Sequence, residues 1–166
     1  MPGFISSSLY TGPGILYSES TLGNTMNNSV YWKHLDHRAD IGIQGIGPSL
    51  EQAFAQAGLA LMAVMCDLEL IREEESRTIK IIGDDQELLL FDFLNELIFL
   101  VCAQGFVYSR LEVDITGDEL HARVRGEPLD SLRHQPAVEV KGASFNGLRV
   151  GRDKNGKYIT SCIVDV

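Results

Sequence analysis

One stretch of the chain restricts the fold more than any other, a predicted helix with an unusually broad apolar face. Between Asp85 and Gly105, apolar side chains recur at helical spacing as Leu89, Phe93, Leu97 and Leu100, and Leu90, Leu94 and Ile98 widen the face. Asp84 or Asp85 can cap the start of this helix, and Gly105 is suited to its end. Because so broad a face must be buried, we expect a sheet to cover most of the helix.

A second helix is predicted from the capping box Ser49-Leu-Glu-Gln52, followed by apolar residues at helical spacing to about Met65. The other segments favour strands, with turn signals at Gly117-Asp118 and Asn155-Gly156, the latter typical of a tight hairpin. The predicted strands are 31–34, 40–46, 78–82, 107–116, 120–125, 137–145, 148–151 and 158–166. Two helices and about eight strands joined by short links predict an α+β domain with mostly antiparallel sheet.

Size and charge exclude several classes of protein. The 166 residues suit one compact domain, and the longest apolar stretch, 87–101, carries too many polar residues to span a membrane. A net charge of −9 argues against an independent nucleic-acid binder, although an acidic protein can still dock onto a nucleic-acid enzyme. The three cysteines form no CxxC pair, so we expect buried, reduced thiols and a cytoplasmic location.

Residues 1–30 differ in composition from the rest of the chain. They are rich in Ser, Gly, Asn and Thr, and Glu19 is their one charged side chain. This composition predicts a flexible extension, or an early start with Met26 as an alternative, ahead of a domain over residues 31–166.

Two carboxylates stand at the edges of apolar runs. Asp40 precedes one predicted strand, and Asp165 follows Ile163 and Val164 near the end of the chain. Together with main-chain or terminal oxygen of Val166, they would form an all-oxygen cluster that suits calcium, magnesium or manganese. The alternative is that Asp165 is only an exposed tail residue.

Three further side chains lie close to these carboxylates in the sequence or in the predicted sheet. The spacing of His34, His37 and Asp40 would place them near one face of a helix, as in some zinc sites. The run looks like a strand, which favours a histidine that hydrogen-bonds locally and orients Asp40. Lys141 interrupts an apolar run and is either the gatekeeper of an edge strand or a cation that reaches an anionic group.

Several short motifs, in order, resemble the archease family. The run from Asp36 to Gly42, DHRADIG, is similar to the family signature DHTADIG, and Ser49 to Phe54 resembles the helix start that follows it. Gly126-Glu127-Pro128, His134 and Glu139-Val-Lys141 resemble a stretch written GE…H…EVKA, and the ending at Val166 resembles the closing DV or DI. The resemblance covers roughly residues 31–166.

The resemblance implies a two-layer α+β domain without catalytic activity of its own. Archeases are accessory proteins of the RtcB-type RNA ligase of tRNA splicing, promote guanylylation of the ligase and permit multiple turnover. The implied metal ligands, most often for calcium, are Asp40, Asp165 and Val166, and the implied partner-activating residues are Lys141 and His37. Neither a membrane nor direct binding of nucleic acid is expected.

Two departures from the family pattern stand out. Arg38 replaces the usual Thr, and Asn146 replaces a usual His while Lys141 is kept. A second function also stays open, a metal-dependent phosphate-ester enzyme that uses Asp40, Asp165 and Lys141.

Overall fold

The computed structural model describes residues 29–166, so the predicted flexible extension, 1–30, lies almost entirely outside the described residues. Within them, seven strands and two long helices alternate along the chain, together with two short helical turns. Their order is β1 (Tyr31–His37), β2 (Asp40–Gly47), α1 (Leu50–Met65), η1 (Leu68–Leu70), β3 (Glu75–Ile82), α2 (Gln86–Cys102), β4 (Phe106–Thr116), β5 (Glu119–Pro128), α3 (Ser131–His134), β6 (Gly142–Arg152) and β7 (Tyr158–Asp165).

The strands form two antiparallel sheets. The four-stranded sheet has the order β1-β2-β7-β6, and the three-stranded sheet has the order β3-β5-β4. The four-stranded sheet therefore joins the first two strands of the described chain to its last two. The three-stranded sheet is built from the middle of the chain.

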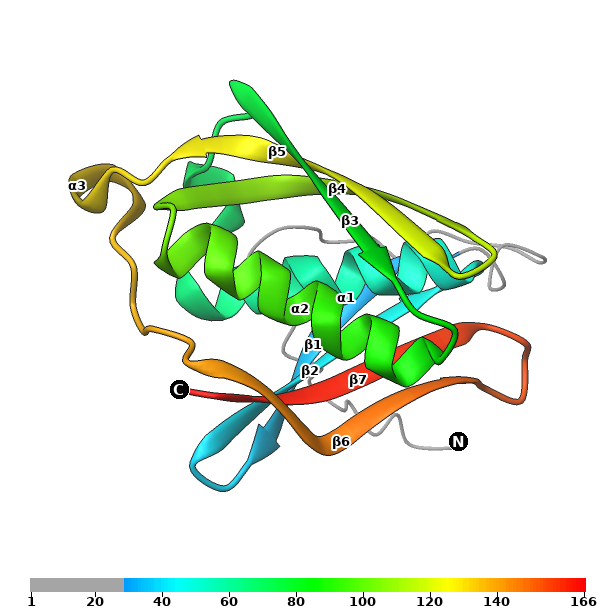
Figure 1. Ribbon diagram of the computed structural model, residues 1–166. Coiled ribbons are helices and arrows are strands. Elements are labelled where there is room, and N and C mark those ends of the chain that lie inside the picture. The colour runs from blue at the N-terminus through cyan, green and yellow to red at the C-terminus, as the bar shows by residue number, and fades with distance from the viewer. Residues whose placement is uncertain (1–28) are drawn as a thin grey trace, which may run out of the picture.

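The two long helices lie between the sheets (Figure 1). Gly45 of β2 shows how closely α1 meets one sheet, because a Cβ there would lie 2.2 Å from the Ala53 carbonyl oxygen. Gly58 faces the other sheet, where a Cβ would lie 2.3 Å from a methyl carbon of Leu111. The α+β class, the antiparallel pairing and the packing by two helices are confirmed. The helical layer is covered on both faces, which adds a second sheet to the two-layer arrangement that was expected.

Local signals set the helix ends as predicted. The Ser49 hydroxyl accepts a hydrogen bond from the Gln52 amide, and the Asp85 carboxylate accepts from the amides of Glu87 and Leu88. At the other end of α2, Gly105 adopts a φ of 62°, and its amide donates to the Val101 carbonyl. Each of these groups satisfies backbone atoms that a helix end leaves without a partner.

The predicted strands 137–145 and 148–151 are strand from residue 142 onward, but they form a single strand, and the predicted start at residue 137 is wrong. One strand, β6, runs from Gly142 to Arg152 through a register shift between Ser144 and Arg149, where Gly147 has a φ of 67°. The residues before β6 form a segment across the helix ends instead, because the Ala137 amide donates to the Met65 carbonyl. Lys141 therefore precedes the edge strand and does not interrupt it.

The cysteine prediction holds for two residues of three. Cys66 and Cys162 are buried, and burial raises the pKa of each thiol to about 11, so both stay protonated at neutral pH. Cys102 is exposed because it lies in the last turn of α2, at the end of the buried stripe. None of the three forms a disulfide within residues 29–166.

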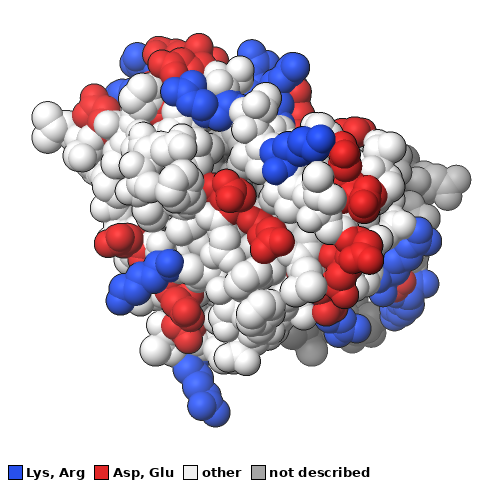
Figure 2. Space-filling view, in the orientation of Figure 1, with Lys and Arg blue, Asp and Glu red and all other residues white. Residues whose placement is uncertain are grey.

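Charged side chains of both signs are interspersed over the three-stranded sheet, along the top of Figure 2. Arg110 pairs with Glu112, and Lys80 pairs with Glu119, among other exposed ion pairs of this sheet. In the part of the chain that the structure describes, neither long helix has the length and apolar content needed to cross a membrane.

Candidate functional site

The two predicted carboxylates lie opposite each other at one end of the four-stranded sheet. Ile41 of β2 pairs with Val164 of β7, so the next step of the antiparallel register places Asp40 opposite Asp165. Directly opposed residues of neighbouring strands point to the same face, with Cβ atoms about 5 Å apart. Asp40 is half-buried and Asp165 is exposed.

His37 extends this row across the β1–β2 hairpin. It pairs with Asp40 on the neighbouring strand, and the turn between them is closed by Arg38 with a φ of 48°. A positive φ is uncommon for arginine, and it allows the chain to reverse within two residues. The tight turn therefore holds His37 and Asp40 at the same end of the sheet. Figure 1 shows the β1–β2 turn and the C-terminal end of β7 at the same end of the molecule.

Lys141 reaches this end from the other side of β7. Its amide donates to the Asp165 carbonyl over 2.8 Å, and the next residue, Gly142, pairs with Asp165. The amide of Ala143 donates to the Asn95 side chain of α2 over 3.2 Å, which fixes the start of β6. The Lys141 side chain is exposed, and Val166 packs half-buried against the core.

His34 does not join this group. It is opposite Ile43 on the helix-facing side of the sheet, and its Nε2 lies 2.8 Å from the Ala60 carbonyl of α1. Because β1 is a strand, His34 and His37 point to opposite faces, so the zinc interpretation is wrong. Among residues 29–166, no three His, Cys, Asp or Glu side chains are arranged to hold a metal.

A buried charged cluster lies close to the Lys141 segment. Glu127 is 2% exposed, and its two carboxylate oxygens accept hydrogen bonds from Arg133 over 2.7 Å each. Its Oε1 also accepts from the Arg72 amide over 2.8 Å and lies 2.9 Å from His134 Nε2. The Arg133 guanidinium, aided by the Arg72 amide and His134, lowers the pKa of Glu127 to about 2.

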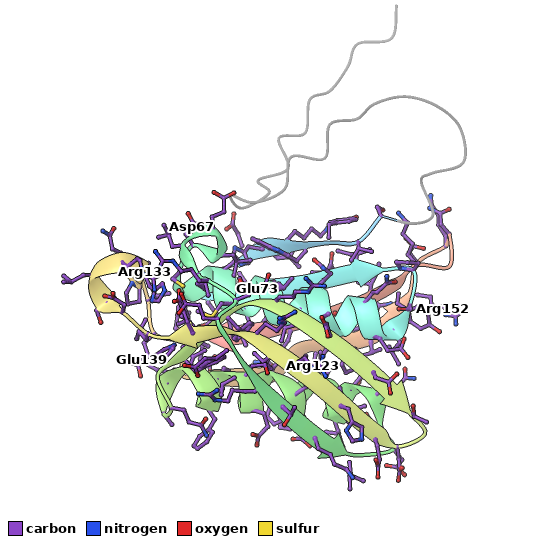
Figure 3. The ribbon with its side chains drawn as sticks, turned by 90° about the horizontal axis from the view of Figure 1, so that it is seen from above. Asp67, Glu73, Arg123, Arg133, Glu139 and Arg152 are labelled. Atoms are coloured by element: carbon purple, nitrogen blue, oxygen red, sulfur yellow. The ribbon has the colours of Figure 1, made fainter. Side chains whose placement is uncertain are left out.

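The tautomer of His134 follows from its two contacts. Its Nδ1 accepts a hydrogen bond from the Asp130 amide over 2.9 Å, so Nε2 carries the proton and donates to Glu127. His134, the Arg133 guanidinium and the Arg72 amide thus satisfy the buried carboxylate. Arg133 lies at the same end of the molecule as Glu139, which precedes Lys141 (Figure 3). The cluster joins the end of β5 to α3, where the segment toward Lys141 begins.

The comparisons with known proteins agree on one family. The model of the Archease protein family matches residues 32–166. The chain belongs to the archease family. It is 34% identical over 139 residues to the protein archease of Pyrococcus abyssi, with 81% of this chain and 98% of that protein covered. It is 35% identical over 140 residues to the archease-like protein of Drosophila melanogaster, with 81% and 90% covered.

Two solved structures share the fold of this archease. The solution structure of protein 1598 of Methanobacterium thermoautotrophicum is 29% identical, with a TM-score of 0.68, over 81% of this chain and 98% of that one. The crystal structure of "an archease, possible chaperone" from Thermotoga maritima is 21% identical, with a TM-score of 0.53, over 80% and 94%. The second likeness concerns the fold alone.

Sequence reasoning placed the candidate residues of this archease better than its supporting cluster. His37, Asp40, Asp165 and Lys141 meet at one end of one sheet, although they come from opposite ends of the domain. The pairing of Glu127 with Arg133 was missed. A glutamate between Gly126 and Pro128 at a strand end was the available signal, but nothing in the sequence says which cation will meet it.

Proposed function

We propose that this archease is a non-catalytic, metal-binding activator of an RtcB-type RNA ligase in tRNA splicing. It promotes guanylylation of the ligase and so permits multiple turnover. The observation that carries the proposal is the meeting of Asp40, Asp165 and Lys141 at one end of the four-stranded sheet. This brings a pair of acidic groups and a lysine to one end of the sheet, where the side chains of Asp165 and Lys141 are exposed and a partner can reach them.

The donor set at this end fits a hard divalent cation. Asp40 and Asp165 supply carboxylate oxygens from opposed register positions, and Val166 supplies main-chain oxygen from the next residue. Oxygen ligands of this kind suit calcium, with magnesium or manganese as alternatives. The bound cation would supply local positive charge, and its protein ligands would hold the strand ends in place.

The lysine has a separate task in this proposal. No carboxylate of residues 29–166 lies within ion-pair distance of Lys141, and its side chain is exposed. A compact ammonium group can therefore contact phosphates bound in the partner's active site. His37, across the sheet from Lys141, would line the opposite side of the same contact.

The metal proposal is tested by thermal stability. Calcium at ~100 times its dissociation constant should stabilise the fold by about 2.7 kcal/mol. Asp40→Ala and Asp165→Ala should each abolish this shift. Asp36→Ala is the matched control, because Asp36 is opposite Ile41 and so belongs to the other face of the same hairpin. If Asp40→Ala responds to calcium as the parent does, Asp40 is not a ligand.

The activator proposal is tested by single-turnover guanylylation of the ligase with GTP, with and without this chain. The parent should accelerate guanylylation, and Lys141→Ala should strongly slow it while calcium binding persists. Lys80→Ala, on the other sheet, is the control for loss of one exposed lysine. Equal stimulation by parent and Lys141→Ala would restrict Lys141 to a structural role.

The alternative function, a metal-dependent phosphate-ester enzyme, is tested with the purified chain alone. If Asp40, Asp165 and Lys141 form a phosphate-ester active site, the pure chain should turn over a chromogenic phosphate ester with manganese. We expect no turnover, because Asp40 and Asp165 are assigned to the cation, His37 is then the one candidate general base of the group, and the group contains no nucleophile. Metal-dependent turnover that Asp40→Ala removes would overturn the activator proposal.

A further inference from the structure

The lysines and arginines of this chain fall into two groups, those that form ion pairs with carboxylates and those that do not. Between residues 72 and 133, every one has a carboxylate oxygen within 4.0 Å. Those of the four-stranded sheet and its turns have no such partner within residues 29–166. Seven of the 14 basic side chains are in this second group: Lys33, Arg38, Lys141, Arg149, Arg152, Lys154 and Lys157.

Four of these seven lie in one hairpin, β6–β7. Residues 149–157 contain four basic side chains and one acidic side chain, a formal charge of +3 in a chain whose net charge is −9. Figure 2 shows blue side chains gathered at the right-hand edge, where Figure 1 places this hairpin. One carboxylate from another element faces this edge, because Glu87 Oε1 of α2 lies 3.4 Å from the Val150 amide. With Glu87 included, the formal charge is still positive, opposite in sign to that of the whole chain, which favours contact with an anion.

The one acidic residue of the hairpin is used inside its turn. Asp153 Oδ1 accepts hydrogen bonds from the amides of Asn155 and Lys157 over 2.8 and 3.0 Å, and the Asp153 amide donates to the Lys157 carbonyl. The loop is therefore longer than the tight hairpin predicted from Asn155-Gly156. Because the Asp153 carboxylate is hydrogen-bonded to these backbone amides, it does not form an ion pair with the lysines and arginines of the hairpin.

An aromatic ring completes the surface. The guanidinium of Arg152 lies 4.2 Å from the centre of the Tyr158 ring and donates to the Tyr158 hydroxyl. Lys157 Nζ donates to the Ser29 hydroxyl over 2.6 Å, while Arg149 and Lys154 are exposed. The contacts of Arg152 and Lys157 hold these cations in place and leave their charge without a counter-ion.

This basic hairpin is at the opposite end of the sheet from the candidate metal ligands. Since β7 is eight residues long and a strand rises ~3.3 Å per residue, Tyr158 and Asp165 are about 23 Å apart. Figure 3 shows Arg152 at one end of the molecule and Glu139, close to Lys141, at the other. A partner that touches both ends must be extended on this scale.

We propose that the β6–β7 hairpin contacts the phosphate backbone of the RNA that the ligase holds. The inference rests on the proposed function, which brings this chain next to an extended polyanion. Arg and Lys side chains around a turn suit phosphates in any sequence, and the Tyr158 ring holds one of these cations, Arg152, in place. The acidic remainder of the chain repels RNA, so the contact forms only once the ligase has bound its substrate.

The test uses the ligase, this chain and a fluorescently labelled pair of tRNA exon halves. The double variant Arg149→Gln/Lys154→Gln removes two exposed, unpaired cations. Lys80→Gln/Arg123→Gln is the matched control, with the same loss of charge from the paired group on the other sheet. The first measurement is the affinity of the ligase complex for RNA at salt concentrations between about 50 and 200 mM. The second is the rate of ligase guanylylation in the absence of RNA.

The hairpin variant should weaken RNA binding by the complex about tenfold at the lower salt, and the slope of log affinity against log salt should fall by about 1 for each lost contact. The control variant should match the parent in RNA affinity and in salt dependence. The parent, the hairpin variant and the control variant should stimulate RNA-free guanylylation equally. Unchanged RNA affinity of the hairpin variant would refute the proposal. Slower RNA-free guanylylation would identify the hairpin as a contact with the ligase protein instead, which also overturns it. If the parent itself fails to stimulate guanylylation, the proposed function has failed. The RNA-affinity measurement still tests the hairpin proposal by itself.

Discussion

Replacement of the buried glutamate is the sharpest test of how this domain is held together. Glu127→Gln keeps the size of the side chain but removes the charge that faces Arg133 over two hydrogen bonds of 2.7 Å. The amide nitrogen of glutamine cannot accept from the guanidinium, so one N–H group of the half-buried Arg133 loses its partner. Removing one member of a buried ion pair costs about 3 to 5 kcal/mol. We expect about 3 kcal/mol here, the lower end, because Arg133 is 29% exposed and keeps Asp130 at 4.0 Å.

The loss can be followed with the single tryptophan. Trp32 is buried in β1, in the other sheet, so its fluorescence reports unfolding of the whole domain rather than a change beside Glu127. Urea titration should give a free energy of unfolding lower by about 3 kcal/mol, and Tm should fall by about 10 °C. Glu112→Gln is the control, because Glu112 makes only exposed ion pairs and should change stability by less than about 0.5 kcal/mol.

The pH dependence gives this prediction a sign. The pKa of Glu127 is lowered from 4.5 to about 2, chiefly by the Arg133 hydrogen bonds, so the folded state holds the ionised form more strongly than the unfolded state does. Its contribution is therefore complete above about pH 4.5 and is lost as the pH falls toward 2. The gap in stability between parent and Glu127→Gln should narrow over this range. A Glu127→Gln protein as stable as Glu112→Gln at neutral pH would refute the reasoning.

Four further outcomes follow from the same structure. Gly45→Ala should destabilise by roughly 3 kcal/mol in urea titration, because its Cβ would meet backbone atoms of Ala53 and Ala57 at 2.2 and 2.4 Å; a loss under about 1 kcal/mol would show that α1 can move away. A peptide tag after Val166 should weaken calcium binding in a titration, and equal affinities would remove the terminal carboxylate from the ligand set. A gel shift of tRNA by the isolated chain at low salt should be empty until the ligase is added, and tight binding alone would contradict the accessory role. Lys141→Ala should keep stability within about 0.5 kcal/mol, while Lys141→Arg should restore guanylylation only in part; full restoration would mean that any cation serves.

The features that the sequence predicted well depend on neighbouring residues. Ser49 and Asp85 cap the helices, and Gly105 ends α2, because each acts on backbone groups within four residues of itself. The predicted hairpin around Gly117-Asp118 is also local, since β4 and β5 pair on either side of it. The alternation of polar and apolar residues and the residue types of turns are therefore sufficient to predict such elements from the sequence.

What the sequence did not predict depends on contacts between distant parts of the chain. Whether the strands form one sheet or two is decided by which ones pair, and β2 finds β7 more than 100 residues away. Residues 137–141 have the composition of a strand but lie across the helix ends, where Met65 accepts the Ala137 amide. The carboxylates of the candidate site were predicted from their place at the edges of apolar runs and the role of Lys141 from the family resemblance, whereas the register that aligns Asp40 with Asp165 came from the structure.

The strand order of the four-stranded sheet has a consequence for synthesis on the ribosome. The sheet takes its first strands from the start of the described chain and its last from the end, so it cannot close while β7 is still inside the exit tunnel. The β3-β5-β4 sheet can form earlier, because all three of its strands have left the tunnel while β7 is still inside it. Domains with such distant pairings fold late and slowly. Asp40 therefore meets Asp165 only in a chain translated to its last strand, and a nascent chain, or one shortened by two residues at its C-terminus, would lack the second carboxylate of the proposed cation site.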